Sequence, residues 1–427
     1  MVRVVVVGGG WAGTGASVAA AQAGAKVTVL ERTDMLLGTG LVGGIMRNNG
    51  RFTASEEAIC MGAGDVFQVI DRTARHKNVD FPGHRHATLY DVSRIEPAIK
   101  RLLADKGVEV FTRSRVKDVK MDGSRIAGLV MENDEVVSGD IYVEATGSAG
   151  PMGNCAKYGN GCAMCILRCP TFGGRVSIAS RAGVKEFIGK KSDGSLGAMS
   201  GSCKLHKDSL SREIAGQLDR TGVVVVPIPE ELRKGEKILA TKACQQYALA
   251  EFAENIILLD TGHAKLMSPF YPLDLLRQIP GFENARYEDP YSGGIGNSMR
   301  YLALSPRDNA LKVEVVDNLF CGGEKAGPLV GHTEAIITGS LAGHNAVRQA
   351  LGLETLVIPG DLAIGDAIAY VNQQMRTDEG LSKKYTFSGS VYFQRMQEKG
   401  LYTTDLEVIR ARVERAGMSG VFKKSIS

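Results

Sequence analysis

Four of the eight cysteines fall close together near the middle of the chain. They follow the spacing Cys155-x6-Cys162-x2-Cys165-x3-Cys169, and a proline comes directly after the last of them. Cys-x2-Cys and Cys-x3-Cys-Pro are parts of the bacterial ligand spacing for a 4Fe-4S cluster. Zinc sites with four cysteines also use Cys-x2-Cys, and thiol or disulfide chemistry needs no metal. The spacing favours an iron–sulfur cluster and leaves zinc and thiol chemistry open.

Candidate proton-transfer residues are few, because the chain has only seven histidines. His84 and His86 lie in a Pro-Gly loop that could approach a cofactor or bind a substrate anion. His332 opens a predicted helix, and Glu324 lies in a glycine turn shortly before it. These four residues are the candidate catalytic groups. No H-E-x-x-H pattern or Ser-His-Asp arrangement is evident, so hydrolysis has no support.

The first residues of the chain predict a turn that binds a dinucleotide. Val4–Val7 is an uninterrupted β-branched run, as expected of a parallel strand buried on both faces. It enters the turn Gly8-Gly9-Gly10-Trp11-Ala12-Gly13. In a GxGxxG turn the first glycine permits the tight turn and the second lets the backbone approach a pyrophosphate. The third lets the following helix pack on the strand.

The segment after this turn completes the pattern. A helix is predicted over Gly15–Gly24 and a strand over Lys26–Leu30, with Glu31 at the tip of that strand. The carboxylate is placed to accept hydrogen bonds from ribose hydroxyls. Strand, turn, helix, strand and acid in this order are stronger evidence than the glycine turn alone. This unit serves both NAD and FAD, so both cofactors stay open at this point.

Glu31-Arg32 and the glycine-rich loop Leu36–Gly44 resemble the "ER…GG" stretch of FAD-dependent oxidoreductases of the glutathione-reductase type. The order of the next predicted elements is similar too. A helix and a strand lead to a β-meander over Arg115–Asp140, and a further strand ends in Ala145-Thr146-Gly147. The resemblance covers residues 1–150 and implies a flavin ring that lies against the glycine-rich loop.

A late segment extends the resemblance. Asn318–Glu324 predicts a strand that enters a glycine turn, and Gly331–Ala335 opens a helix. In FAD proteins of this kind the N-terminus of that helix points at the flavin, which favours FAD over NAD. Leu319–Arg348 resembles the glucose-inhibited division protein A family, which includes folate- and FAD-dependent tRNA uracil-5-methyltransferases. Ile279–Ala285 is similar to the "IPGLENA" of those methyltransferases, whereas the cysteine cluster has no counterpart in that pattern.

Together, the glycine turn and these resemblances imply a set of cofactor-binding residues. The set is Gly8, Gly10, Trp11, Ala12, Gly13, Glu31, Arg32, Gly38, Gly43, Gly44, Arg115, Val116, Ala145, Thr146, Gly147, Gly322, Gly323, Glu324 and Thr333.

Composition sets outer bounds on the function. The chain has 427 residues, enough for two or three domains, and a net charge of +4 that neither demands nor excludes a nucleic-acid partner. No apolar run reaches the length of a membrane span. A core strand begins almost at Met1, which leaves no room for a signal peptide. We therefore expect a cytoplasmic protein without a membrane partner.

The expected fold is α/β: a Rossmann-like FAD-binding fold with a β-meander, an inserted α+β domain and a helical C-terminal segment. Within the inserted domain we expect a strand at Val223–Val226 and a helix over Lys234–Glu254. The expected parts are the first FAD-binding part at 1–150, the inserted substrate and cysteine-cluster domain at 151–300, the returning FAD-binding part at 301–360 and the C-terminal segment at 361–427.

Two functions fit these observations. The first is an FAD-dependent oxidoreductase whose 4Fe-4S cluster exchanges electrons with the flavin, acting on a small-molecule substrate or a redox partner protein. The alternative is an RNA-modifying enzyme similar to the flavin- and folate-dependent tRNA uracil methyltransferases. The cysteine spacing favours the first, and the likeness around Leu319–Arg348 favours the second. A homo-oligomer is compatible with either function.

Overall fold

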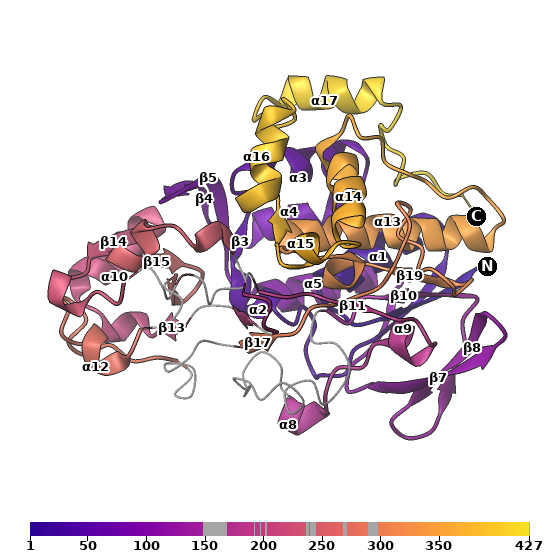
Figure 1. The fold of residues 1–427 in the computed structure, drawn as a ribbon, viewed down its shortest axis with the longest axis horizontal. Coiled ribbons are helices and arrows are strands. Elements are labelled where there is room, and N and C mark those ends of the chain that lie inside the picture. Colours follow the sequence, from indigo (N-terminus) through magenta and orange to yellow (C-terminus); the bar gives the residue numbers. More distant parts are fainter. Residues whose placement is uncertain are drawn as a thin grey trace.

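The structure is a computed structural model. It describes residues 1–147, 169–191, 193–196, 198–200, 203–235, 239, 245–267, 271–288 and 298–426 (Figure 1). Cys155, Cys162 and Cys165 lie outside the described residues. For Cys169, the first residue of the short helix α8 (Cys169–Phe172), only the backbone is described.

A parallel sheet of five strands forms the centre of the molecule, in the order β19-β10-β1-β2-β6. Its strands are β1 (Arg3–Val7), β2 (Lys26–Leu30), β6 (Glu109–Phe111), β10 (Ile141–Glu144) and β19 (Leu319–Cys321). Strand β1 pairs with β2 on one side and β10 on the other, and its four valines are at most 5% exposed. The run of valines is buried on both faces, and the predicted α/β class is confirmed.

Helices α1 (Trp11–Gln22) and α13 (His332–Ala350) cover one face of this sheet, and Figure 1 shows the β-meander on the other. The two helices pack closely because glycine lies at their contact. A Cβ atom at Gly339 would lie 2.0 Å from the carbonyl oxygen of Ala12, and one at Gly343 would lie 2.1 Å from that of Ala16. The meander comprises β7 (Val116–Asp122), β8 (Arg125–Met131) and β9 (Val136–Val137).

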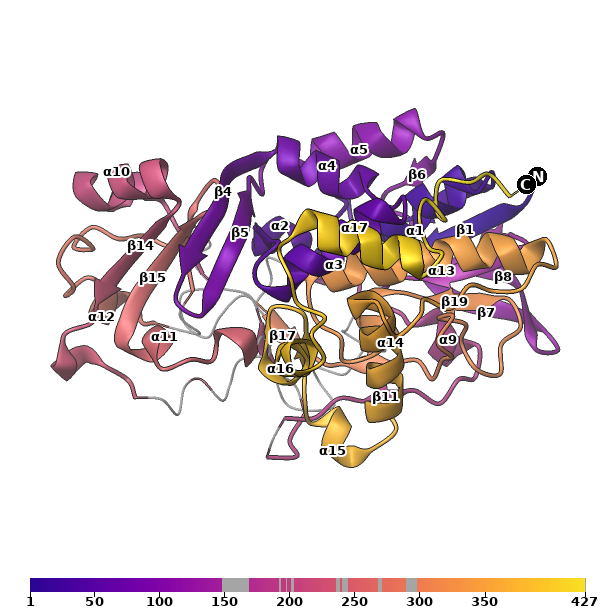
Figure 2. The ribbon, with the colours of Figure 1, turned by 90° about the horizontal axis from the view of Figure 1, so that it is seen from above.

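A second region, with two further sheets, lies to one side of this core (Figure 2). The first sheet has the order β3-β5-β4, from β3 (Ile45–Met46), β4 (Ala74–Phe81) and β5 (His84–Tyr90). The second has the order β13-β16-β15-β14, from β13 (Lys204–Leu205), β14 (Val223–Pro227), β15 (Asn255–Asp260) and β16 (Ala264–Leu266).

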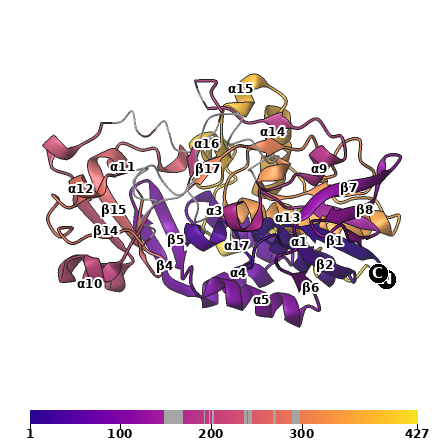
Figure 3. The ribbon, with the colours of Figure 1, turned by 90° about the horizontal axis from the view of Figure 1, so that it is seen from below.

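The two sheets share an apolar core, and helices cover the outer face of the second. Side chains of the β4–β5 hairpin pack against β15 and α11 (Glu251–Glu254). Figure 3 shows α10 (Arg212–Thr221) and α12 (Leu273–Leu276) on the side away from the hairpin. The strand expected at Val223–Val226 is confirmed, but the expected long helix is wrong within residues 245–254, which hold only a 3-10 turn (Gln245–Tyr247) and α11.

The C-terminal segment is helical, as predicted, and lies over α3 (Gly50–Cys60) and α13 (Figure 1). Its tail packs beside α3, where the N–H of Phe422 donates to the carbonyl of Met61 at 2.9 Å. The segment contains α14 (Ala363–Gln374), α15 (Asp378–Leu381), β20 (Tyr385–Thr386), α16 (Ser390–Glu398) and α17 (Leu406–Arg415). The boundaries predicted between the four parts of the chain stay a prediction.

The remaining elements are short or lie at the periphery. They are α2 (Gly40–Gly43), α4 (Asp65–Arg72), α5 (Ile95–Asp105), α9 (Ile178–Arg181), β11 (Phe187–Ile188), β12 (Ala198–Ser200), β17 (Ser298–Arg300), β18 (Ala303–Leu304), η1 (Lys207–Ser209), η2 (Glu230–Leu232) and η5 (Gly323–Ala326). Over the described ranges, no helix has both the length and the apolar character needed to cross a membrane.

Candidate cofactor site

The turn between β1 and α1 has the geometry of a phosphate-binding turn. Gly8 has φ +100°, and a Cβ there would lie 2.4 Å from the carbonyl oxygen of Ala145. A Cβ at Gly13 would lie 1.8 Å from the oxygen of Gly8, so each position requires glycine. By contrast, a Cβ at Gly10 would meet no other described atom within 4 Å. Backbone is therefore exposed to open space at the point where a pyrophosphate would bind.

The N-terminus of α1 is available to an anion. Within the described chain no side chain caps it, and its first turn holds no acidic residue. The helix dipole and the N–H groups of the first turn favour negative charge at such an end. The residues present thus fit the pyrophosphate of a dinucleotide.

Glu31 lies at the tip of β2, beside this turn, and is 8% exposed. One carboxylate oxygen accepts from the N–H of Gly9 at 2.8 Å, and the other accepts from the N–H of Thr33 at 2.8 Å. These bonds fix the carboxylate next to the glycine turn, where a ribose would follow the pyrophosphate. The Arg32 guanidinium donates instead to the carbonyl of Gly173 at 2.7 Å.

Arg115 and Val116, predicted beside the adenine, lie at the start of the meander. The Arg115 guanidinium donates to the carbonyl of Gly174 at 2.9 Å and forms an ion pair with Glu132. Val116 is 4% exposed and belongs to the main core. Arg32 and Arg115 thus hold neighbouring carbonyls of one segment.

The end of the glycine-rich loop packs closely against the side chains of His332 and Thr261. A Cβ at Gly43 would lie 1.6 Å from Cε1 of His332, and one at Gly44 would lie 2.3 Å from the Cγ2 of Thr261. Gly38 faces open space. The loop can therefore follow this path only with glycine at its end.

Three rings gather where this loop meets α13. Trp11 and Tyr90 lie edge to face with ring centroids 5.9 Å apart, and His332 lies 6.2 Å from Trp11. The Tyr90 hydroxyl donates to the carbonyl of Gly40 at 2.6 Å, and it lies 3.4 Å from Nδ1 of His332. Burial raises the pKa of Tyr90, so this hydroxyl stays protonated.

The strand ends β10 and β19 close the site from the other side. The N–H of Gly322 donates to the carbonyl of Glu144 at 3.0 Å. A Cβ atom at Gly323 would lie 2.9 Å from the Cβ atom of Ala12. Thr146 donates its hydroxyl to Glu144 at 2.8 Å. The predicted segments Ala145–Gly147 and Gly322–Gly323 thus meet the glycine turn, and Glu324 follows half-buried in η5.

A buried charge cluster beneath these strand ends was not foreseen. The Glu144 side chain is fully buried and accepts from the N–H groups of Ile178 and Ala179 at 3.0 and 2.9 Å. The buried ammonium of Lys325 lies 3.8 Å from it and pairs with Glu186. Burial raises the pKa of Glu144, although Lys325 opposes the change. The sequence feature that could have indicated this cluster is Glu144 itself, an acid at the end of an otherwise apolar strand.

A second unforeseen pair fixes the N-terminus of α13. Glu334, in its first turn, accepts from the Nε of Arg51 with both oxygens at 3.1 Å. It also accepts from the hydroxyl of Thr386 at 2.7 Å and the N–H of Phe387 at 3.0 Å. Thr333, beside it, is fully buried. The C-terminal segment therefore holds the helix end that is expected to face a flavin.

Two lysines of the sheet β13-β16-β15-β14 contact the glycine-rich loop. This sheet falls within the predicted insertion at 151–300 and is called the inserted sheet below. Lys204 and Lys265 are paired across β13 and β16. Lys204 donates to the carbonyl of Leu41 at 3.3 Å, and Lys265, 4% exposed, donates to that of Val42 at 2.6 Å. The inserted sheet thus contacts the loop on which a flavin ring is expected to lie.

The contacts of His84 favour a structural role over a catalytic one. Its ring is 2% exposed and lies between Phe81 and Tyr247, with centroid distances of 4.8 Å to each. Its Nδ1 is 2.9 Å from the amide nitrogen of Asn48, and its Nε2 is 3.0 Å from the carbonyl of Gln246. Both ring nitrogens are therefore engaged.

His86 lies further along β5, half-buried, with its Nδ1 3.1 Å from Oδ1 of Asn78. The converging segments Gly8–Gly13, Ala145–Gly147 and Gly322–Gly323 are called the glycine cradle below. Of the four predicted catalytic residues, Glu324 directly follows the cradle, and the His332 ring lies 6.2 Å from that of Trp11 within it. The other two lie on the β4–β5 hairpin. Catalysis by any of the four stays a prediction.

The cysteine cluster is not tested by this geometry. Among the described residues, no group of three or more His, Cys, Asp or Glu side chains is arranged to hold a metal ion. Cys155, Cys162 and Cys165 fall outside those residues, as does the side chain of Cys169. Both the iron–sulfur and the zinc interpretation stay predictions.

Curated relatives match a limited segment of the chain. The chain is 32% identical over 114 residues to "Methylenetetrahydrofolate--tRNA-(uracil-5-)-methyltransferase TrmFO" of Caldicellulosiruptor bescii. This match covers 26% of the chain and 25% of that protein. It is 37% identical over 90 residues to "tRNA uridine 5-carboxymethylaminomethyl modification enzyme MnmG" of Chlorobaculum tepidum, covering 21% and 14%. The matches therefore span a quarter or less of these relatives.

The fold extends further than the sequence identity. The structure of Aquifex aeolicus GidA aligns with a TM-score of 0.61 over 97% of this chain and 76% of that one, at 15% identity. At this identity the likeness shows the fold alone. The family model "Glucose inhibited division protein A" matches residues 3–249 and 261–354. Because that match covers most of the chain, the protein belongs to the glucose-inhibited division protein A family, as its late glycine turn predicted.

Proposed function

We propose that the protein binds FAD and uses it to modify a base in RNA, with tRNA as the substrate class. The observation that carries the cofactor part of this proposal is the convergence of three glycine segments, Gly8–Gly13, Ala145–Gly147 and Gly322–Gly323, at the start of α1. The RNA part rests on the names of the relatives. Membership of the family supports FAD rather than NAD as the cofactor.

In this proposal the chain binds and orients the cofactor. The N–H groups at the start of α1 hold the pyrophosphate, and Glu31 holds the adenosine ribose. Arg115–Val116 lies by the adenine. The N-terminus of α13, at His332 and Thr333, favours negative charge on the flavin pyrimidine ring. When bound, FAD supplies hydride or electron transfer.

The names of the relatives support RNA as the substrate. The TrmFO and MnmG proteins are both named for modification of tRNA uracil or uridine. The net charge of +4 is compatible with a polyanionic substrate. RNA modification therefore fits the relatives better than electron transfer through an iron–sulfur cluster.

Trp11 allows cofactor binding to be tested without any activity assay. It is the chain's single tryptophan, and it is the first residue of α1, next to the proposed pyrophosphate site. We expect titration with FAD to quench most of the tryptophan emission, because the flavin accepts excitation energy at short distance. The Trp11→Phe protein should lack the emission and still bind FAD by absorbance. Absence of flavin from both proteins after reconstitution would refute the cofactor proposal.

The RNA proposal requires its own assay. FAD-loaded protein is incubated with a tRNA transcript and methylenetetrahydrofolate labelled in its one-carbon unit. We expect label in the RNA and none when FAD is withheld. A preparation that holds FAD but neither binds nor labels the transcript would refute tRNA methylation. The protein would then be a flavoprotein with another substrate.

The cysteine spacing supports a second candidate, electron exchange between the flavin and a 4Fe-4S cluster. Anaerobically prepared protein should then contain about four iron and four sulfide per chain. Cys165→Ser should remove the iron and leave FAD bound, because Cys165 falls outside the segment Gly8–Glu31 that is proposed to hold the cofactor. Cys60→Ser, outside the cluster, is the matched control. One zinc and no iron would make the site structural.

A further inference from the structure

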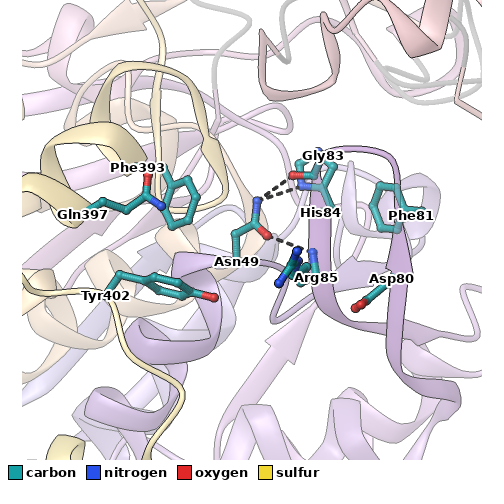
Figure 4. Close-up of a pocket in the computed structure, with 9 residues that line it drawn as sticks. All are labelled: Asn49, Asp80, Phe81, Gly83, His84, Arg85, Phe393, Gln397 and Tyr402. Atoms are coloured by element: carbon teal, nitrogen blue, oxygen red, sulfur yellow. Dashed lines mark hydrogen bonds between the residues drawn. The ribbon is translucent and has the colours of Figure 1, made fainter.

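A pocket of about 530 Å³ lies between the β4–β5 hairpin and the C-terminal segment. Figure 4 shows Phe393, Gln397 and Tyr402 of the α16 region on one side, with Gly83 and His84 of the hairpin on the other. Its volume is within the range of small-molecule sites. It is formed by segments some three hundred residues apart in the sequence and is separate from the glycine cradle.

The pocket combines aromatic faces with polar groups. The rings of Phe393 and Tyr402 lie edge to face with centroids 5.1 Å apart. Arg85 lines the pocket and is exposed. Gln397 adds an exposed amide. Asp80 is the acidic lining residue, and its Oδ1 accepts from the N–H of His86 at 3.0 Å.

The base of the pocket is held in a strained conformation. Asn49, which precedes α3, has φ 52° and ψ −131°, values that a residue other than glycine rarely adopts. Its amide nitrogen donates to the carbonyls of Gly83 at 2.9 Å and Ser388 at 2.8 Å, and its oxygen accepts from the N–H of Arg85 at 2.8 Å. The side chain joins both walls. Strain that is held by such bonds is commonly found at ligand sites.

The pocket is connected to the helix end that is expected to face the flavin. Asn48, next to Asn49, accepts from the Arg51 guanidinium at 3.2 Å. Arg51 is paired with Glu334 in the first turn of α13. The amide nitrogens of Asn48 and Asn49 lie 2.9 and 3.4 Å from Nδ1 of His84. A ligand that contacts Asn49 is therefore connected through His84, Asn48 and Arg51 to the first turn of α13.

We propose that this pocket binds one unstacked nucleobase of the RNA substrate, with Arg85 contacting its phosphate. The proposal rests on the proposed function and adds a position for the RNA. Proteins that read single-stranded RNA stack splayed bases on aromatic side chains and bond their edges with polar groups. Phe393 and Tyr402 supply the faces, Gln397 the edge contact and Arg85 the cation.

The test measures binding of a fluorescently labelled tRNA transcript to FAD-loaded protein. Phe393→Leu removes the aromatic face, and Arg85→Gln removes the exposed charge. Each should weaken binding at least about fivefold, as loss of one stacked base or phosphate contact does. A blunt RNA duplex without unpaired bases should bind parent and Phe393→Leu equally.

Matched controls separate the pocket from general effects. Phe111→Leu changes a ring that is 51% exposed on β6, and Arg101→Gln removes an exposed charge on α5. Both should bind the transcript within twofold of the parent, and the FAD content of every variant reports its folding. Unchanged affinity in Phe393→Leu and Arg85→Gln, with the parent binding RNA, would overturn the pocket proposal. A parent that holds FAD but binds no RNA would overturn the proposed function instead.

Discussion

Glu57 is a buried acid that joins two helices. From α3 its carboxylate accepts the N–H groups of Ala363 at 3.0 Å and Ile364 at 3.1 Å, at the start of α14. Burial raises its pKa from 4.5 to about 7, although these bonds and Arg412 oppose the shift. The protonated form is therefore favoured in the folded state.

This shift predicts a specific dependence of stability on pH. Because the folded pKa lies above the unfolded one, the contribution of Glu57 is fully present below the unfolded value of 4.5 and is lost as the pH rises through about 7. The stability of Glu57→Gln relative to the parent should therefore rise between pH 5 and pH 8, by on the order of 3 kcal/mol. Denaturant unfolding at several pH values measures it.

Glu414→Gln, an exposed change on α17, is the control and should show no such trend. A gap between Glu57→Gln and the parent that stays constant from pH 5 to pH 8 would mean that Glu57 ionises normally. The absolute cost of Glu57→Gln at low pH is a separate quantity, since a glutamine oxygen can accept only one of the two N–H groups in the same geometry.

Single residues also mark the limit of prediction from sequence. The positions of the turn's glycines and of Glu31 were predictable because the geometry of the turn depends on neighbours a few residues away. Arg51 was not, because its partner Glu334 is 283 residues distant. Glu144 and Lys325 meet only when β10 and β19 pair. Pairs of this kind depend on tertiary structure and leave only weak signals in the sequence.

Among the elements, the contact between α1 and α13 is the most sensitive to side-chain size. Gly339 touches Ala12, in the first turn of α1, and Gly343 touches Ala16, one turn further along. Alanine at either position would force the helices apart and destabilise the protein by roughly 1–3 kcal/mol. Gly339→Ala should also weaken FAD binding, because it displaces the helix end that we propose holds the phosphates.

Gly343→Ala separates these two effects, since it should lower the melting temperature and retain most of the FAD affinity. Gly360→Ala is the control: its Cβ would meet no described atom within 4 Å. Equal loss of FAD from both helix variants would show that the contact acts through stability alone. Thermal unfolding and FAD titration of Gly339→Ala, Gly343→Ala and Gly360→Ala distinguish the two effects.

Element prediction succeeded where burial sets a simple pattern. The strand at Val4–Val7 is apolar through its length, and the one at Ile141–Glu144 is buried at every residue, because parallel strands are covered on both faces. The helix expected up to Glu254 failed in its described part. There, Tyr247 and Phe252 pack into the core shared with the hairpin, and tertiary contacts override helix propensity.

At the scale of the whole molecule, Asp260 ties the inserted sheet to the β4–β5 hairpin, which forms one wall of the pocket. Its carboxylate, fully buried at the end of β15, accepts from the Arg75 guanidinium at 2.9 Å and lies 2.8 Å from Nε2 of His76, both on β4. Lys207 of η1 donates to it at 2.7 Å. Burial alone would raise the pKa of Asp260, but the bonds from Lys207, His76 and Arg75 lower it below its usual value.

Asp260→Asn should therefore destabilise the inserted sheet at neutral pH by roughly 1–3 kcal/mol, since it removes the buried carboxylate that Arg75 and Lys207 share and leaves both cations with the exposed Asp219. The difference should shrink below pH 4, because a depressed carboxyl pKa gives stability that is lost as the carboxylate protonates. Hydrogen exchange should quicken in β14–β16 and in the β4–β5 hairpin but not in β1 or β10. Asp208→Asn, whose side chain is 76% exposed in the same region, should leave exchange unchanged. Uniform acceleration across the central sheet would instead mean that the inserted region and the cofactor-binding core unfold as one unit.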